Sequence, residues 1–370
     1  MDPLPWREAW HEALYAAGRG FYVARGGPAA HFTTAAHGPT GAALARALLR
    51  LWLRDHDEPP AVVVDVGAGR GELATHLVHA LAELRYAVAS DREEPPRPGD
   101  PDPVEWALSD GFERREVPTR RGEVPTRRGE VATRVVAVDV VERPEGLDER
   151  VEWLRSPGGA ALPPQLDHLR DALVVAHEWL DVVPCTVAQV DTDGTARTVL
   201  VDPETGTETL GAPLSGAEQA WAARHWTGSG PGDRIEVGLE RDRAWADLVS
   251  RVDSGTLLAV DYGHTAAARP SGGTLTAYAL GQQTAPVPDG SCDVTAHVAM
   301  DSLDADEVRP QRETLRALGV TGTTPAHALA TREPLAYLAA LERAGAAARL
   351  LDRTGFGGFW WAVKRVGGQP

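Results

Sequence analysis

Cysteine is scarce in this chain of 370 residues. The two cysteines, Cys185 and Cys292, are too few for a disulfide framework, and they do not form a metal-ligand pattern. The start of the chain lacks the charged segment and apolar run of a signal peptide. No apolar run reaches the roughly 20 residues that cross a bilayer. The sequence therefore predicts a reduced, cytoplasmic protein with no membrane span.

Positive charge is also limited. The formal net charge is −16, and Lys364 is the only lysine. A general binder of the nucleic-acid backbone needs a basic face, so we expect no nucleic-acid partner. The acidity is compatible with a basic peptide partner, but it is also an ordinary means of staying soluble. Nothing in the sequence indicates the oligomeric state.

The histidines do not suggest a metal site. His76 and His79 are neighbours on a predicted helix, and His31 and His37 lie close together before it. Neither pair has a third ligand at the spacing that metal sites use. We expect structural or surface roles for them.

One glycine-rich segment, residues 62–73, is the most informative part of the chain. It begins as an apolar strand and continues through Gly67, Gly69 and Gly71 into a predicted helix. Glycines at alternate positions let the backbone approach a ligand, and a helix N-terminus favours an anionic group. The spacing is one residue short of the G-x-G-x-x-G dinucleotide fingerprint. With Asp65 before the first glycine, it resembles motif I of class I S-adenosylmethionine methyltransferases; the alternative is a tight strand-to-helix turn.

Strand-like and helix-like segments alternate along the chain. This alternation predicts an α/β fold with a mostly parallel sheet and helices on both faces. We predict helices at residues 6–17, 41–54, 72–84, 215–226 and 242–252, strands at 62–66, 135–140, 151–154, 172–176, 256–260 and 355–363, and a hairpin within 187–209.

Residues 92–133 interrupt this pattern. The segment is rich in proline and then repeats a seven-residue unit, Glu-Val-Pro-Thr-Arg-Arg-Gly, from Glu116 and again from Glu123. A third copy begins at Glu130. Little in it is apolar enough to bury, so we predict a solvated, largely disordered insertion. A methyl-acceptor or docking role for Arg-Arg-Gly is the weaker alternative.

The insertion leaves two candidates for the second strand. Residues 86–91 are one, and residues 134–141 are the other. We choose 135–140, because a strand buried on both faces favours its longer β-branched run. Asp139 then lies near the carboxyl end of this strand, where its two oxygens can accept from both hydroxyls of a ribose. The alternative for Asp139 is a turn former at the end of a strand.

Several further segments occur in a characteristic order. They are Gly20-Phe21-Tyr22, His31-Phe32-Thr33-Thr34-Ala35, the 65–71 loop, His177-Glu178-Trp179-Leu180-Asp181-Val182-Val183-Pro184, Val260-Asp261-Tyr262-Gly263 and Asp293-Val294-Thr295-Ala296-His297-Val298. Outside residues 86–133 the chain resembles the MidA-like S-adenosylmethionine-dependent methyltransferase family, whose mitochondrial members include the arginine methyltransferase acting in respiratory complex I assembly. The resemblance implies a class I, Rossmann-like sheet of seven strands, S-adenosyl-L-methionine as cofactor and a protein arginine acceptor. Two departures are His177 where the family usually has Asn, and Asp65 where Glu is more common.

The resemblance also suggests a division of the chain. We expect an N-terminal helical cap or lid at residues 1–54 and a methyltransferase domain at 55–370. Within that domain we expect the disordered insertion at 92–133 and an inserted substrate subdomain, built from a β-hairpin and helices, at 186–235. The aromatic pair Phe21-Tyr22 is predicted either to cover the cofactor or to pack in the core.

The candidate site residues come from strand ends, where ligands lie in such sheets. For the cofactor they are Asp65, Gly67, Gly69, Gly71 and Asp139, with Asp65 accepting from the ammonium group. For catalysis they are Glu178, Asp181 and His177.

Glu178 is the predicted guanidinium clamp, because carboxylates hold that planar group bidentately. Asp181 is its partner if a helical turn opens after the fourth strand. His177 is a candidate proton relay. The alternative for both acids is capping of a helix N-terminus.

The predicted function is a methyltransferase acting on a basic, arginine-containing protein. A catalytically silent assembly or scaffold protein with the same fold is the main alternative, and a nicotinamide-dependent oxidoreductase is disfavoured by the glycine spacing. Residues 261–264 are predicted to end the fifth strand, where they either line the pocket or turn the chain.

Overall fold

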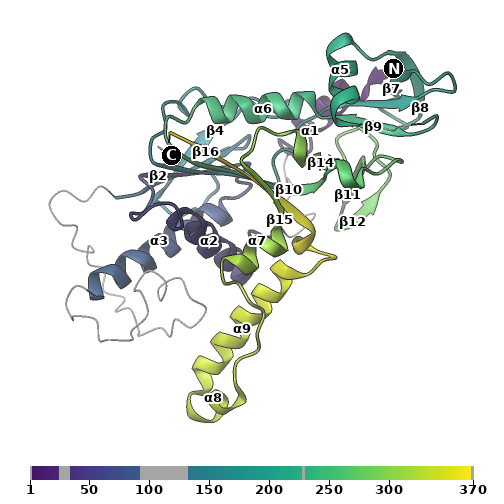
Figure 1. The fold of residues 1–370 in the computed structure, drawn as a ribbon. Helices are drawn as coiled ribbons and strands as arrows, with labels where there is room; N and C mark the ends of the chain where they lie inside the picture. Colours follow the sequence, from purple (N-terminus) through teal and green to yellow (C-terminus); the bar gives the residue numbers. More distant parts are fainter. Residues whose placement is uncertain (1, 25–33, 92–131, 227–229, 368–370) are drawn as a thin grey trace.

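The computed structural model describes residues 2–24, 34–91, 132–226 and 230–367 (Figure 1). Almost all of the predicted insertion, including its repeats, lies outside these residues. None of the helices in the described part of the chain combines the length and apolar character needed to cross a bilayer.

The centre of the fold is a large, mostly parallel sheet. Its order is β15-β16-β10-β5-β2-β3-β4, and β14 pairs with β10. Strands β10, β5, β2, β3 and β4 are parallel neighbours, whereas β16 and β15 run antiparallel. The strands are β2 (Val62–Val66), β3 (Arg134–Asp139), β4 (Val151–Arg155), β5 (Ala172–His177), β10 (Gly255–His264), β14 (Val298–Ala299), β15 (Glu307–Pro310) and β16 (Phe359–Val366).

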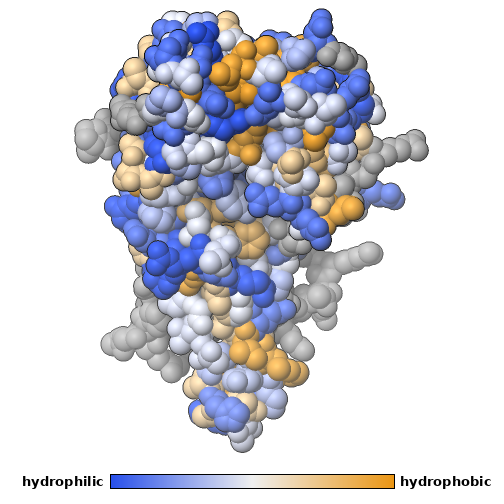
Figure 2. Space-filling model, turned by 90° about the vertical axis from the view of Figure 1, so that its right-hand side faces the viewer, coloured by the Kyte–Doolittle hydropathy of each residue, from blue (hydrophilic) through white to orange (hydrophobic). Residues whose placement is uncertain are grey.

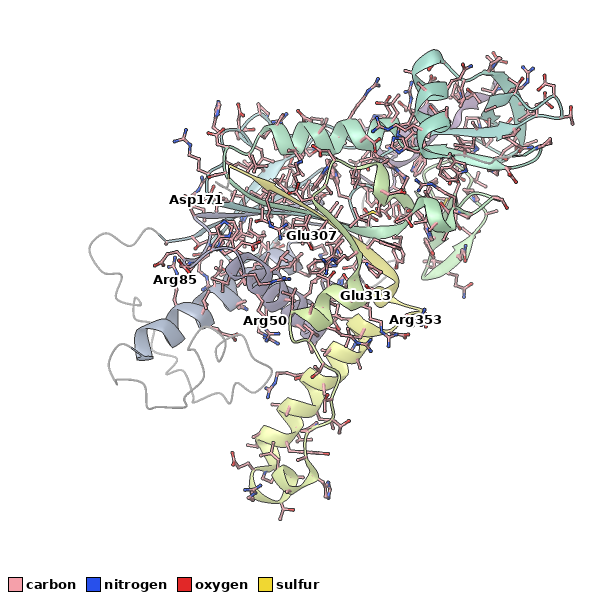
Figure 3. All side chains as sticks on the ribbon, viewed as in Figure 1. Arg50, Arg85, Asp171, Glu307, Glu313 and Arg353 are labelled. Atoms are coloured by element: carbon pink, nitrogen blue, oxygen red, sulfur yellow. The ribbon has the colours of Figure 1, made fainter. Side chains whose placement is uncertain are left out.

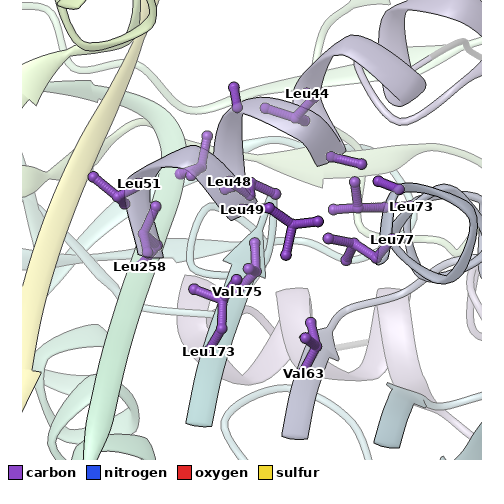
Figure 4. Close-up of a cluster of buried hydrophobic side chains, with 14 of the residues drawn as sticks. Leu44, Leu48, Leu49, Leu51, Val63, Leu73, Leu77, Leu173, Val175 and Leu258 are labelled. Carbon is purple, nitrogen blue, oxygen red and sulfur yellow. The ribbon is translucent and has the colours of Figure 1, made fainter. Parts of the chain in front are cut away.

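Helices cover both faces of this sheet (Figure 1). On one face α2 (Gly38–Leu53), α3 (Glu72–Asp91), α7 (Gln311–Ala317) and α9 (Pro334–Leu351) contribute to one apolar cluster. Figure 4 shows leucines of α2 and α3 packed on Val63, Leu173, Val175 and Leu258 of the strands. On the other face α6 (Leu239–Ser250) packs in a second cluster. Every residue of β2 and of β5 is buried, which explains their continuous apolar sequences.

A second, antiparallel sheet stands beside the first. Its order is β1-β7-β6-β9, and β8 pairs with β7. Helix α1 (Trp6–Tyr15) packs against it, and α5 (Gly216–His225), which begins with a Ser215–Glu218 capping box, covers β9. A three-stranded sheet completes this region. The strands are β1 (Leu4–Pro5), β6 (Thr186–Val190), β7 (Ala196–Val201), β8 (Glu208–Pro213), β9 (Arg234–Val237), β11 (Thr276–Ala279), β12 (Gln282–Thr284) and β13 (Asp293–Thr295).

Helix α8 (His327–Arg332) and the first half of α9 project from the body as an arm (Figure 1). Leu335, Leu338 and Leu341 are exposed on α9. Figure 2 shows an apolar patch low on this arm, below a hydrophilic band. Short 3₁₀ helices occur at Ala266–Ala268, Met300–Ser302 and Phe356–Gly358.

Most predicted elements are present, with three corrections. The choice of the second strand is confirmed, because β3 pairs in parallel with β2. Residues 86–91 belong to α3, so this helix runs beyond its predicted end at residue 84. Strand β10 continues to His264, so Asp261 lies inside a strand and not at its end. Within the described residues the main sheet has eight strands, of which seven form the continuous path.

The predicted subdomain at 186–235 corresponds to most of the antiparallel sheet and α5. Helix α2, within the predicted cap, packs into the core against the sheet. The division of the chain into cap and domain stays a prediction.

A matched pair of glycines tests the packing of α2. An alanine Cβ at Gly41 of α2 would lie 1.9 Å from the backbone oxygen of Ala36, whereas at Gly345 of α9 it would only touch the Arg349 side chain at 3.9 Å. We expect Gly41→Ala to destabilise the protein by at least about 2 kcal/mol through overpacking. Gly345→Ala should be neutral or stabilise by up to about 1 kcal/mol, because alanine is the better helix former. Urea unfolding of both variants measures the difference; equal stabilities would contradict the packing.

Candidate active site

A cavity of about 510 Å³ opens at the carboxyl ends of β2, β3 and β5. Ligands bind at this edge of open α/β sheets. Its lining includes seven of the predicted site residues: Asp65, Gly67, Gly69, Asp139, His177, Glu178 and Asp181. Gly71 is not in the lining; its missing Cβ faces Leu147 and Trp153. The predicted residues are therefore brought together, with Gly71 supporting the turn from behind.

The glycine turn connects β2 to α3. Gly67, Gly69 and Gly71 have φ values of 75°, 59° and 78°, a region that favours glycine. The amides of Gly67 and Ala68 both donate to the Val138 carbonyl at 3.0 Å, which ties the turn to β3. Apart from Gly69 and its two chain neighbours, no atom of the described residues lies within 4 Å of the position that a Cβ of Gly69 would occupy. The backbone is therefore open to a ligand at this point.

Asp139 links the end of β3 to the glycine turn. The Gly69 amide donates to its Oδ2 at 2.7 Å, and the amides of Val140 and Val141 donate to its Oδ1 at 2.7 and 3.3 Å. Burial raises the pKa of Asp139, and these hydrogen bonds oppose that effect. The local bonds are those of a strand-end turn former. A carboxylate offers about four acceptor positions, so capacity for a ligand hydroxyl is left.

Asp65 ends the apolar run of β2 as a buried acid. Its side chain is 2% exposed, and its Oδ2 has no hydrogen-bond partner among the described residues. Burial raises the pKa of Asp65 to about 7, and the nearby Asp139 carboxylate adds to the shift. A positively charged ligand group would favour the ionised form.

The chain after β5 turns sharply. Glu178 has φ of +53°, which is uncommon for a residue with a side chain, and its amide donates to the Val260 carbonyl at 2.9 Å. The Val183 amide then donates to the Leu180 carbonyl in a β-turn, and β6 follows at Thr186. No helix begins here. The predicted helical turn is wrong, and capping of a helix does not account for Asp181.

Four further acids share this wall of the cavity or its support: Glu178, Asp181, Asp261 and Asp293. Burial raises the pKa of Glu178 to about 8, with the Asp181 carboxyl adding to the shift, and it raises the pKa of Asp293 to about 8 as well. The pKa values of Asp181 and Asp261 are also raised, chiefly by burial. Burial thus favours the protonated form of all four groups, and a cation that approached them would favour the ionised form.

The acids are only partly satisfied by neighbouring donors. The Tyr22 hydroxyl donates to Asp293 Oδ1 at 2.6 Å, and the Thr295 hydroxyl donates to Asp181 Oδ2 at 2.8 Å. Within the described residues, one oxygen of each of Glu178, Asp181 and Asp261 has no hydrogen-bond partner.

Arg241 is the buried cation nearest these acids, but it does not pair with them. Its guanidinium donates to the backbone carbonyls of Asp181, Val183 and His297 at 2.7, 3.0 and 2.9 Å. The amides of Leu180 and Asp181 donate to Asp261 Oδ2 at 3.0 and 3.1 Å. Arg241 and Asp261 therefore position the loop from both sides and leave its carboxyl groups without a cation.

His177 lies beside the acids as a neutral base. Its Nδ1 is 3.4 Å from Glu178 Oε1, and its Nε2 has no partner among the described residues. Burial lowers the pKa of His177 to about 4, so the ring is uncharged at neutral pH. This weakens its candidacy as a proton relay.

Several residues of the site had no chemical role in the sequence prediction. Tyr15, Tyr22 and Asp293 line the cavity, and the Tyr15 hydroxyl donates to the Val182 carbonyl at 3.0 Å. Of the aromatic pair, Phe21 is buried in the core, whereas Tyr22 reaches the cavity. Tyr22 and Asp293 belong to motifs that the family resemblance singled out. Across the described residues, no group of three acids, histidines or cysteines has the arrangement of a metal site.

The raised pKa of Glu178 predicts a pH-dependent stability. The folded protein holds this proton up to about pH 8, whereas the unfolded chain releases it near pH 4.5. Its contribution to stability is therefore present below pH 4.5 and is lost as the pH rises through 8. Without ligand, Glu178→Gln should match the parent protein at pH 4 and melt at least about 2 °C higher at pH 9. Thermal unfolding measures this, with the exposed Glu149→Gln as control; parallel curves for parent and Glu178→Gln would contradict the raised pKa.

Comparisons with known proteins agree with this geometry. Residues 126–319, more than half of the chain, match the model of a family described as "Putative S-adenosyl-L-methionine-dependent methyltransferase". A protein from Burkholderia thailandensis, crystallised with S-adenosyl-homocysteine, has a similar fold, with a TM-score of 0.68 and 21% identity over 100% of this chain and 89% of that one. A native structure of an uncharacterized protein from the same organism is also similar. Its TM-score is 0.64, and the sequence identity is 22% over 100% of this chain and 88% of that one.

No curated protein sequence matches the chain significantly. The family match, the class I methyltransferase fold and the cavity at the glycine turn lead to one conclusion: the chain belongs to the MidA-like family of S-adenosylmethionine-dependent methyltransferases.

Proposed function

We propose that this methyltransferase modifies a positively charged acceptor, the guanidinium of an arginine in a basic protein segment. One observation carries the proposal: Glu178 Oε1 and Asp181 Oδ1 are buried at the cavity without hydrogen-bond partners in the described chain. Buried acceptors without donors are costly, and a guanidinium supplies several donors and a compensating charge.

The cofactor end of the cavity fits an amino-acid nucleoside. We assign the open backbone at Gly69 and the orphaned Oδ2 of Asp65 to its amino-acid portion, with Gly67 in the same turn. We assign the remaining acceptor capacity of Asp139 to a hydroxyl of its ribose. Gly71 acts indirectly, by allowing the turn to pack on Leu147. When bound, S-adenosylmethionine supplies an electrophilic methyl group on a positively charged sulfonium.

The acceptor end has to hold the guanidinium and take up its proton. We assign Glu178 to the bidentate clamp, and Asp181, fixed by the Thr295 hydroxyl, to a second contact. The guanidinium loses a proton as it gains the methyl group. The positive guanidinium favours the ionised form of Glu178 when it binds, and the ionised carboxylate can then accept that proton. Glu178 is the stronger base of the two neighbours, because its pKa is raised to about 8 whereas that of His177 is lowered to about 4. His177 is then a neutral neighbour of the clamp, with its Nδ1 3.4 Å from Glu178 Oε1 but not hydrogen-bonded to it.

The N-terminal residues form one wall of this cavity. Tyr15, Tyr22, Thr34 and His37 all contribute to the lining. This supports a role for residues 1–54 as a cap that excludes water from the transfer.

The proposal separates cofactor binding from transfer. Glu178→Gln should bind S-adenosylhomocysteine within about twofold of the parent protein, because the amide keeps the shape of the side chain. It should lower methyl transfer at least 100-fold, because the amide cannot take up the proton. Calorimetry and tritium transfer from labelled cofactor into arginine-rich proteins of a cell extract measure the two effects, with Glu149→Gln as control. Equal losses of binding and transfer would show that Glu178 is structural.

Asp139 tests the cofactor assignment. Asp139→Ala should raise the dissociation constant for S-adenosylhomocysteine at least tenfold, which corresponds to about 1.4 kcal/mol. Asp139→Asn removes the charge of the side chain but keeps one oxygen that can accept from the backbone. Its dissociation constant should therefore lie between those of the parent protein and of Asp139→Ala. Unchanged affinity in the alanine variant would remove the ribose assignment.

The identity of the acceptor needs its own experiment. Mass spectrometry of proteins from a deletion strain and its parent should show a methyl-arginine that is present only in the parent. Cofactor binding with no transfer to any protein, beside an active control enzyme, would instead favour the catalytically silent scaffold.

A further inference from the structure

A second cleft is separate from the methyltransferase cavity. It has a volume of about 790 Å³ and lies between α7, the loop at residues 319–323 and the end of α9. The two cavities share no lining residue. Four arginines contribute to its walls: Arg312, Arg316, Arg349 and Arg353. Such a concentration of positive charge is unexpected in a chain whose net charge is −16.

No carboxylate of the described residues neutralises these arginines. None of the four forms an ion pair within the described residues, and among their side chains only that of Arg349 has a hydrogen bond there, from its Nε to the Thr40 hydroxyl at 3.1 Å. Asp352 is the one carboxylate in the lining, and its Oδ1 accepts from the amide and hydroxyl of Thr354. Glu313 stands on α7 near Arg353 but pairs with no arginine of the cleft (Figure 3).

The helix dipoles favour the positions of only two of the four cleft arginines. Arg316 and Arg349 lie in the last turns of α7 and α9, where a cation is favoured. Arg312 lies in the first turn of α7, where a cation is disfavoured, and Arg353 lies beyond the end of α9. Arg312 and Arg353 therefore have no role in stabilising the fold that the described contacts reveal.

The cleft offers donors in a compact arrangement. Arg312 and Arg316 are four residues apart on α7 and so lie on one side of that helix, and Arg349 and Arg353 line the cleft from the end of α9 and the residues after it. Thr321 and Thr323 add hydroxyls at the rim. Between them Gly322 approaches α9 so closely that a Cβ would lie 3.1 Å from Ala348, which holds the loop against the helix.

We propose that this cleft binds a compact phosphate-bearing anion with a diphosphate group. Guanidinium groups bind phosphate oxygens bidentately, and four of them match the charge of such a group. The acidity of the remaining chain disfavours an extended polyanion such as nucleic acid, which contacts many phosphates along its length.

Calorimetry with pyrophosphate tests the site on the full chain. The titration is made with saturating S-adenosylhomocysteine, so that the first cavity is filled. We expect saturable binding that weakens as salt is raised, and at least a tenfold higher dissociation constant in the double variant Arg312→Gln/Arg353→Gln. The exposed Arg332→Gln on α8 is the matched control and should bind as the parent does. Absence of binding below 10 mM, or equal binding by the double variant and the parent, would overturn the proposal.

Competition then identifies the source of the phosphate. ADP carries a diphosphate in soluble form, and vesicles that contain CDP-diacylglycerol carry a diphosphate in a lipid headgroup. Displacement of pyrophosphate by ADP alone supports a soluble ligand, and displacement by the vesicles alone supports a lipid headgroup. If neither displaces pyrophosphate, the cleft does not recognise phosphate groups of biological ligands and the proposal fails.

Discussion

The burial of several carboxyl groups at one edge of the sheet is the constraint on which the site depends. Asp65, Asp181, Asp261 and Asp293 are buried, and Glu178 beside them has a side chain that is only 19% exposed; the five acids come from four segments of the chain. The buried cation beside them, Arg241, donates to carbonyl groups. The acids are thus either protonated or matched by a charge that a ligand brings. A sulfonium, an ammonium and a guanidinium are all positive, so one physical arrangement explains the cofactor and supports the proposed acceptor.

The fold holds these acids against their mutual repulsion. Asp261 lies inside β10 and accepts hydrogen bonds from two backbone amides of the loop after β5. Arg241 donates hydrogen bonds to carbonyl groups of the same loop. Glu178 keeps a left-handed backbone conformation, a strain of order 1–3 kcal/mol that the surrounding sheet must offset. Strain and buried charge in one short loop are typical of a site organised for binding, because neither improves the stability of the empty protein.

The parts of this account that follow from local sequence were predictable. Strands β2, β3 and β5 are continuous apolar runs, and Asp139 follows directly from the choice of β3. The length of β10 could not be predicted, because the polar residues 261–264 resemble a strand end. Only the pairing of β10 with β16 and β14 extends the strand to His264. The backbone of Glu178 has no local signal. The contact of Tyr22 with Asp293 joins residues 271 positions apart, which no pattern along the chain could reveal.

Proton release on ligand binding tests the central claim most directly. Calorimetric titration of S-adenosylmethionine at pH 7, repeated in buffers of different ionisation enthalpy, gives the number of protons exchanged. If a cationic ligand ionises buried acids such as Asp65, whose pKa is raised to about 7, binding should release a measurable fraction of a proton, and the fraction should be smaller for the uncharged sulfur of S-adenosylhomocysteine. Binding of both ligands with no proton exchanged would show that the acids are already ionised in the free protein and would contradict the account.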